Sequence, residues 1–111
     1  MTNLIVVGSA IAALLAGVDY GPDYKVDPRD SGPAVIDVSR YPEPMKKNYE
    51  MYSVKCAKCH PLARSVNARF SPADWKRYIK KMIRRPNSGI NEEQAANIYD
   101  FLQYYAVQNG R

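Results

Sequence analysis

The sequence contains few of the residues from which disulfide scaffolds and metal clusters are built. Its 111 residues include two cysteines, one histidine and one tryptophan. Two cysteines cannot support a disulfide-rich fold, and a single histidine leaves them one ligand short of a structural zinc site. No segment of 20–50 residues is repeated, which excludes a solenoid. A composition of 46% hydrophobic and 24% charged residues excludes a disordered acidic tail and a multi-span membrane protein, and the length allows one small domain.

Charge is distributed unevenly along the chain, although the formal net charge is only +5. Residues 46–85 hold twelve basic and two acidic side chains, whereas residues 1–45 and 86–111 are both net acidic. A protein that binds nucleic acid through its overall charge would be basic throughout. The pattern therefore indicates one local basic surface and argues against a nucleic-acid partner.

Long hydrophobic runs are absent except near the N-terminus, where residues 4–18 carry no charge. As a helix this run would be about 22 Å long, shorter than the roughly 30 Å hydrocarbon core of a bilayer. Its length suits a signal peptide, but no Lys or Arg precedes it. Small residues recur along it at a spacing of four, as in helices that pack closely within membranes. We expect residues 1–18 to be a membrane anchor or an uncleaved signal segment.

Residues 19–44 contain five prolines and alternating acidic residues, and they show no helical period. Proline keeps such a chain extended at about 3 Å per residue. Several tyrosines and the apolar stretch 35–38 are unusual for a flexible tether. The segment is predicted to be an extended linker, or a strap that lies along the surface of a partner protein.

The remaining residues, 45–111, have the pattern of an all-α domain with about three helices, the first of which leads into the cysteines. Ser71 followed by Asp74 is a helix start signal, and this second helix must end before Pro86. Asn91 and two glutamates mark the start of a last helix. Its predicted buried stripe consists of Ala95, Ile98, Leu102 and Tyr105. Three short helices bury too little apolar surface to be stable alone. We therefore expect a group other than the side chains to complete the hydrophobic core.

Both cysteines and the histidine fall within five consecutive residues, Cys56-Ala57-Lys58-Cys59-His60. Cys-x-x-Cys-His is the haem attachment sequence of c-type cytochromes. The two thiols form thioethers with one porphyrin, and the adjacent histidine binds the iron. A redox dithiol of the thioredoxin type would lie in a strand-rich fold, and the sequence predicts no strands. A zinc knuckle would need a fourth soft ligand, which the sequence lacks. The motif predicts one covalently bound haem c, which would also supply the missing core.

With this motif, the chain from about residue 41 to 105 resembles a short bacterial class I monohaem cytochrome c. The resemblance lies in the haem motif, in the pattern Trp75-x-x-Tyr78-Ile79-x-x-Met82 and in the last helix. It implies that the first and last helices cross, with the haem between them and a distal segment that bears a methionine. The step of 22 residues from His60 to Met82 is shorter than in mitochondrial-type members.

The second axial ligand of the iron is predicted by elimination. No second histidine exists, and the thioether of a methionine is the usual alternative. Met45 and Met51 precede the motif too closely to reach the opposite face of the ring, whereas Met82 is separated from it by a loop and a helix. Met82 is therefore the predicted ligand, although it shares a face with apolar residues as a core methionine would. Lys81 or a ligand from a partner is the alternative.

Other side chains are candidates for contacts with the haem or with a partner. Trp75 can donate its indole N–H to a haem propionate, and Arg64 or Arg69 can pair with one, but a core tryptophan and solvated arginines explain these residues equally well. The basic residues around the motif form a candidate docking surface for an acidic redox partner. They are Lys55, Lys58, Lys76, Arg77, Lys80, Lys81, Arg84 and Arg85.

A haem whose axial positions are filled by His60 and Met82 has no open site for a substrate, so we expect single-electron transfer rather than enzymatic catalysis. With residues 1–44 holding it to other subunits, the protein would be a tethered subunit of a respiratory or photosynthetic complex. Because c-type haem is attached outside the cytoplasm, we expect the periplasmic side of a bacterial membrane. Two alternatives remain open. One is a haem sensor or peroxidase-like protein in which Met82 leaves the iron open, and the other is a mainly structural haem subunit of a membrane complex.

Overall fold

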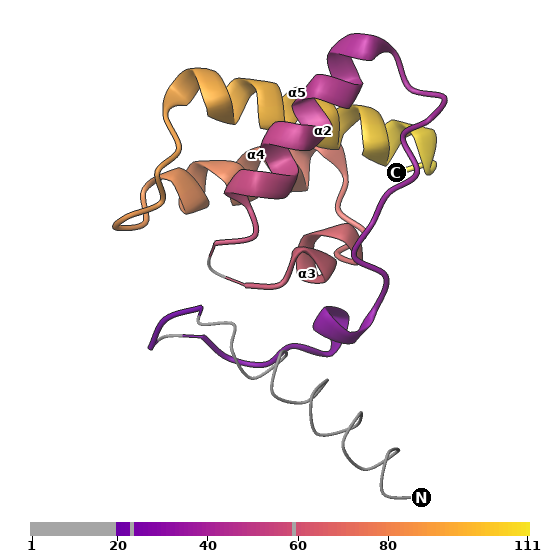
Figure 1. Ribbon diagram of the computed structural model, residues 1–111. Coiled ribbons are helices and arrows are strands. Elements are labelled where there is room, and N and C mark those ends of the chain that lie inside the picture. The colour runs from indigo at the N-terminus through magenta and orange to yellow at the C-terminus, as the bar shows by residue number, and fades with distance from the viewer. Residues whose placement is uncertain (1–19, 23, 59) are drawn as a thin grey trace, which may run out of the picture.

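The computed structural model describes residues 20–22, 24–58 and 60–111, and Figure 1 shows how the helices are arranged. One turn of 3-10 helix is followed by four α-helices: η1 (Pro28–Ser31), α2 (Glu43–Lys55), α3 (Leu62–Val66), α4 (Pro72–Ile83) and α5 (Glu92–Gln108). The described part of the chain contains no strand, which confirms the all-α prediction there. The expected anchor at residues 1–18 lies outside the described residues, and no described helix is long and apolar enough to cross a bilayer.

The starts of α4 and α5 are fixed by the side chains that the sequence predicts. Ser71 caps α4 by accepting a hydrogen bond from the Asp74 backbone N–H at 3.2 Å, and the Asp74 carboxylate accepts one from the Ser71 N–H at 3.1 Å. Asn91 and Gln94 make the same reciprocal pair at the start of α5. These caps satisfy backbone donors that have no partner within the helix, so both helix starts are set locally.

The core lies where α5 packs between α2 and α4. The ring of Phe101 on α5 is completely buried, with its centroid 5.1 Å from that of Tyr49 and 5.4 Å from that of Tyr52. Phe101 was absent from the predicted stripe, whereas Tyr105, which was included in it, is only half-buried. The apolar side of α5 is therefore centred on Phe101, and the buried residues of this helix are Ala95, Ile98, Phe101, Leu102 and Ala106.

Helix α3 is a short element that the sequence did not predict. It has five residues and starts after Pro61, directly downstream of the haem motif. Ala63, Ser65 and Val66 are buried against the core. An isolated helix of this length is unstable in water, because forming its first turn costs more conformational entropy than the few hydrogen bonds return. Its contacts with the rest of the chain must therefore keep it folded.

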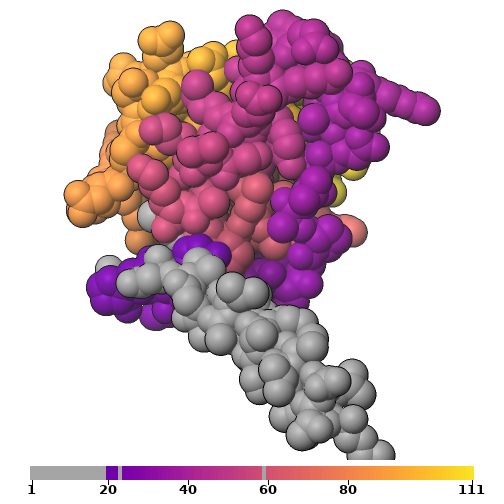
Figure 2. All heavy atoms as spheres, viewed as in Figure 1, coloured from indigo at the N-terminus to yellow at the C-terminus, as the bar shows by residue number. Residues whose placement is uncertain are grey.

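Residues 24–41, here called the strap, lie against the helical domain along most of their length (Figures 1 and 2). Ile36 of the strap is buried in the core, and its backbone N–H donates to the Tyr49 hydroxyl at 3.1 Å. Further towards the N-terminus, η1 contacts α3. Most of the predicted linker is thus part of the domain surface, because its apolar and charged side chains find partners on the helices.

The aromatic packing around Phe101 predicts a large loss of stability when that ring is removed. Phe101→Ala should lower the free energy of unfolding by about 3–5 kcal/mol, because it removes a buried ring and leaves a cavity. Val107→Ala, on the exposed side of the same helix, should change it by less than about 0.5 kcal/mol. Denaturant unfolding followed by circular dichroism measures both. Equal losses for the two variants would contradict this account of the core.

Candidate functional site

His60 lies in the loop between α2 and α3, with only 8% of its surface exposed. Its Nδ1 atom is 3.1 Å from the carbonyl oxygen of Pro61, and its Nε2 atom is 2.9 Å from the hydroxyl of Tyr78 on α4. Both ring nitrogens therefore have a partner. The imidazole connects the start of α3 to the middle of α4.

These two contacts determine which nitrogen of the His60 ring carries the proton. A carbonyl can only accept a hydrogen bond, so the Nδ1–H donates to Pro61 and Nε2 holds a lone pair. The Tyr78 hydroxyl then donates to Nε2. Burial lowers the pKa of His60 below its usual value, which favours the neutral ring. A neutral imidazole with a lone pair on Nε2 is the form that binds a metal ion.

A small apolar cavity of about 20 Å³ lies between α2, α4 and α5. Cys56, the residue that ends α2, borders it from one side and Met82 of α4 from another. This volume is about that of a single water molecule, so the walls of the cavity are nearly in contact. The other large side chains that line it include Tyr52, Trp75, Tyr78, Ile79, Ile98 and Leu102.

Trp75 is a wall residue of this cavity with an unsatisfied polar atom. Its side chain is completely buried, and its indole Nε1 has no hydrogen-bond partner among the described residues. Burying an N–H without an acceptor costs about 1–3 kcal/mol. The indole N–H is not exposed in the cavity, whose surface is entirely apolar. A buried donor of this kind can be satisfied by an acceptor on a bound group, and donation from Trp75 to a haem propionate stays a prediction.

The predicted site residues are thus partly brought together. Cys56, Trp75 and Met82 border one cavity, and His60 adjoins it through Tyr78, which lies one helical turn before Met82 on α4. The predicted contribution of Cys59 lies outside the described residues. Among those that are described, no three His, Cys, Asp or Glu side chains gather as they do in a metal cluster.

The two arginines predicted to contact propionates lie apart from the cavity walls. Arg64 on α3 forms a two-pronged ion pair with Asp30 of the strap, at 3.0 and 2.9 Å. Arg69 is exposed in the turn between α3 and α4, where its backbone adopts a positive φ of 58°. Arg64 therefore has a structural partner within the chain.

Six basic residues lie together on the outer surface of α4 and at the two positions that follow it, Arg84 and Arg85. They fall on two adjacent rows at a spacing of four residues, and all of them are exposed. The only acidic residue of α4 is Asp74, which pairs with Arg77. Because like charges four residues apart repel one another, this surface opposes helix stability rather than supporting it. The two rows are Lys76, Lys80 and Arg84, and Arg77, Lys81 and Arg85.

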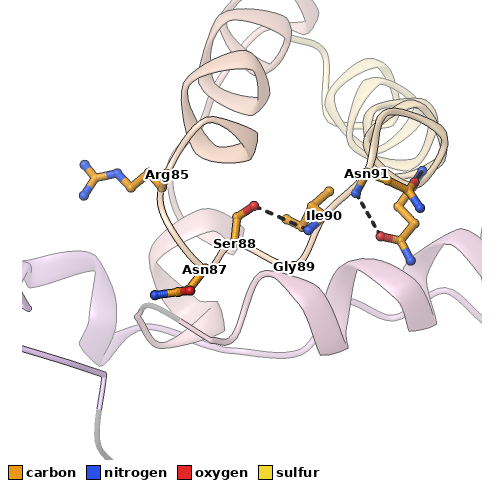
Figure 3. Close-up of a pocket in the computed structure, with 7 residues that line it drawn as sticks. Arg85, Asn87, Ser88, Gly89, Ile90 and Asn91 are labelled. Carbon is orange, nitrogen blue, oxygen red and sulfur yellow. Dashed lines mark hydrogen bonds between the residues drawn. The ribbon is translucent and has the colours of Figure 1, made fainter.

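The loop from α4 to α5 forms an open hollow next to this surface (Figure 3). Ser88 stabilises the loop, because its hydroxyl donates to the Ile83 carbonyl at 3.2 Å and accepts from the Ile90 N–H at 3.4 Å. Lys55, at the end of α2, donates to the carbonyl of Gly89 at 2.9 Å. This bond uses one of the predicted docking lysines to hold the loop beside the haem motif.

Two groups of the site were missed by sequence reasoning, namely the Tyr78 hydroxyl and the Pro61 carbonyl. The helical spacing from Trp75 to Tyr78 and from Tyr78 to Met82 places all three residues on one face of α4, and this signal was available. The carbonyl of Pro61 carries no signal in the sequence, because its orientation depends on how α3 is packed.

The chain matches no protein-family model, and it matches no curated protein and no solved structure.

The Tyr78–His60 hydrogen bond predicts a stability effect in the protein without a bound group. Tyr78→Phe leaves a buried lone pair on Nε2 without a donor and should lower the free energy of unfolding by about 1–3 kcal/mol. Tyr99→Phe is the control, since no described residue bonds to the Tyr99 hydroxyl. Thermal unfolding of the haem-free chain measures both variants. If Tyr78→Phe proves as stable as Tyr99→Phe, the bond does not hold the ring.

Proposed function

We propose that this protein is a monohaem c-type cytochrome that carries single electrons between redox partners. The observation that supports this most strongly is the state of His60. The histidine of a Cys-x-x-Cys-His sequence is buried, which lowers its pKa, and its Nδ1–H is held by a backbone carbonyl. The same arrangement fixes the orientation and raises the basicity of histidines that bind metals. Its Nε2 lone pair accepts the Tyr78 hydroxyl in the haem-free chain and would exchange this partner for the iron.

The chemistry of the surrounding side chains fits a haem. Cys56 and Met82 border a cavity whose walls are almost entirely apolar and aromatic, and Trp75, which also lines it, has a buried N–H donor without a partner. Because the walls nearly touch, a porphyrin can enter only when they move apart. When bound, the haem would supply reversible one-electron chemistry at its iron. In this proposal Cys56 and Cys59 hold the ring covalently, and His60 and Met82 bind the iron.

A tethered location follows from the same proposal. Residues 1–18 would hold the protein at the periplasmic side of a bacterial membrane, as a subunit of an electron-transfer complex. If both axial positions are filled, no site for a substrate is left at the iron. The protein would then act as an electron relay rather than as an enzyme.

The partner in this proposal is a redox protein with an acidic docking surface. The two rows of cations on α4 and at its C-terminal end support this, because they remain exposed and almost without acidic neighbours despite their mutual repulsion. Cavity-lining residues of α4, Met82 among them, lie on the inner side of the same helix. An acidic protein bound to the outer side would therefore come within one helix diameter of the proposed haem site, about 10 Å.

Visible spectroscopy of purified protein tests the assignment of the axial ligands. We expect one haem per chain with a low-spin c-type spectrum and the weak far-red band of iron bound to a thioether. Met82→Ala should abolish this band and make the iron high-spin. Met51→Ala, a half-buried methionine on α2, is the matched control and should leave the spectrum unchanged.

Each alternative outcome has a distinct meaning. A high-spin spectrum in the unaltered protein would favour the sensor or peroxidase-like function, with an open distal position. An unchanged spectrum in Met82→Ala would make Met82 a core residue and direct the search to Lys81 or a partner's ligand. Protein that contains no haem when produced with the haem-attachment machinery would refute the proposal.

The docking surface can be tested by the dependence of electron transfer on salt. Neutralising one cation in each row, as Lys80→Gln with Arg85→Gln, should slow electron transfer to an acidic redox protein about tenfold at low ionic strength. The effect should disappear as salt screens the charges. Lys47→Gln with Arg40→Gln is the control, because both side chains are exposed and belong to neither row. Stopped-flow rates over a range of ionic strengths measure it. Equal slowing by both pairs would mean that only net charge matters.

A further inference from the structure

The five-residue helix α3 controls the carbonyl that orients His60. Pro61 is the residue that caps the N-terminus of α3, and its carbonyl oxygen is the acceptor for the His60 Nδ1–H. It also accepts the backbone N–H of Arg64, at 3.1 Å, as part of the first turn of α3. Any rotation of α3 would therefore move the acceptor of the His60 hydrogen bond. Because α3 is too short to be stable alone, its orientation must be fixed from outside.

The inner side of α3 is held by two tyrosines of the core. The hydroxyl groups of Tyr52 and Ser65 are 2.5 Å apart, and the Tyr105 hydroxyl donates to the carbonyl of Val66 at 3.2 Å. Both contacts lie in the C-terminal half of α3. These contacts alone would still let α3 rotate about its inner side. Contacts on its outer side are therefore needed to fix its orientation.

The outer side of α3 is held by the strap through one charged pair. Both oxygens of the Asp30 carboxylate accept hydrogen bonds from Arg64, from Nε at 3.0 Å and from Nη2 at 2.9 Å. Their side chains are only 8% and 19% exposed, so water screens the pair weakly. Asp30 also accepts a bond from Tyr24 at 2.9 Å, and Arg64 stacks over the Tyr24 ring at 5.4 Å. Such a forked pair has a fixed geometry as well as strength.

A second contact joins the strap to the end of α3. The amide of Asn67, the residue that ends α3, donates to the carbonyl of Ala63 at 2.7 Å and to that of Pro33 in the strap at 2.9 Å. Gly32 passes so close that a Cβ placed on it would meet the Asn67 amide at 2.5–2.9 Å. The strap thus contacts α3 at two points that are separated along the helix, which prevents it from rotating.

We infer that Asp30 and Arg64, together with Asn67, are positioning residues for the iron ligand His60. The strap clamps α3 from outside, α3 fixes the Pro61 carbonyl, and this carbonyl orients the imidazole. The role towards iron depends on the proposed function, whereas the clamp itself is a property of the chain. In this inference, a segment that begins 36 residues before His60 in the sequence is part of its coordination environment.

The test compares Asp30 of η1 with Asp27, the residue that caps the N-terminus of this 3-10 helix. Asp30 reaches across to α3, while Asp27 pairs with Arg29 inside the strap. Asp30→Asn and Asp27→Asn each remove one negative charge and keep an oxygen acceptor. In the haem-free chain, Asp30→Asn should speed hydrogen exchange of the α3 backbone amides about tenfold, and Asp27→Asn should not. In the haem-loaded protein, Asp30→Asn should let added imidazole displace a protein ligand of the iron about tenfold more readily. It should also shift the reduction potential, whereas Asp27→Asn should change neither property.

A second variant acts on the clamp without changing any charge. Gly32→Ala should push the strap away from Asn67 and reproduce both effects of Asp30→Asn. Agreement between the two variants would show that displacement of α3, rather than a lost charge, alters the site. Overall helicity by circular dichroism must stay unchanged in both variants.

Several outcomes would overturn the inference. Unchanged exchange of α3 in Asp30→Asn would show that the strap does not hold this helix. Faster exchange with unchanged imidazole binding and potential would show that α3 does not position His60. Protein that carries no haem would refute the proposed function and the role towards iron, while the exchange measurement would still decide whether the clamp exists.

Discussion

The hydrogen bond between the His60 ring and the Pro61 carbonyl is the constraint on which the site depends. It assigns the proton to Nδ1 and leaves Nε2 with a lone pair. Tyr78 can then donate to Nε2, which joins α4 to the last residue of the Cys-x-x-Cys-His motif. The same carbonyl begins α3, so the chemistry of the ring and the packing of this short helix are set together. Contacts that fix the orientation of α3 consequently also fix the orientation of the His60 imidazole.

Helix α4 combines two surfaces of opposite character. Its inner face holds Trp75, Tyr78 and Met82 beside an apolar cavity. Its outer face carries four exposed cations, and two more, Arg84 and Arg85, follow the helix directly. The capping box of Ser71 and Asp74 offsets part of the repulsion between these cations, because it stabilises the first turn and places a negative charge near the helix N-terminus. This division lets one rigid element contribute both to a buried site and to an exposed surface.

Local signals in the sequence predicted the parts of the fold that depend on neighbouring residues. The caps of α4 and α5 are pairs of residues three apart, and their helices begin where Ser71 and Asn91 indicate. The strap and α3 depend instead on contacts between residues about 34 positions apart, such as Asp30 with Arg64. Such a pairing leaves no periodic pattern, so the strap resembled an extended linker. Within the site, the sequence indicated His60 and Met82 as ligands, but the acceptor and donor that orient the ring became visible only in the folded chain.

The docked strap has a consequence for how far the domain can travel. An extended linker over residues 19–44 would let the domain move through a radius of about 80 Å around an anchor. With the strap fixed to the domain from Tyr24 onwards, only residues 19–23 separate it from the apolar run, and they span about 15 Å at most. Under the proposed function, in which residues 1–18 are an anchor, the domain would sample only a small volume next to it. Its encounters would be limited to partners in the same assembly, at a high local concentration, rather than to proteins that diffuse past.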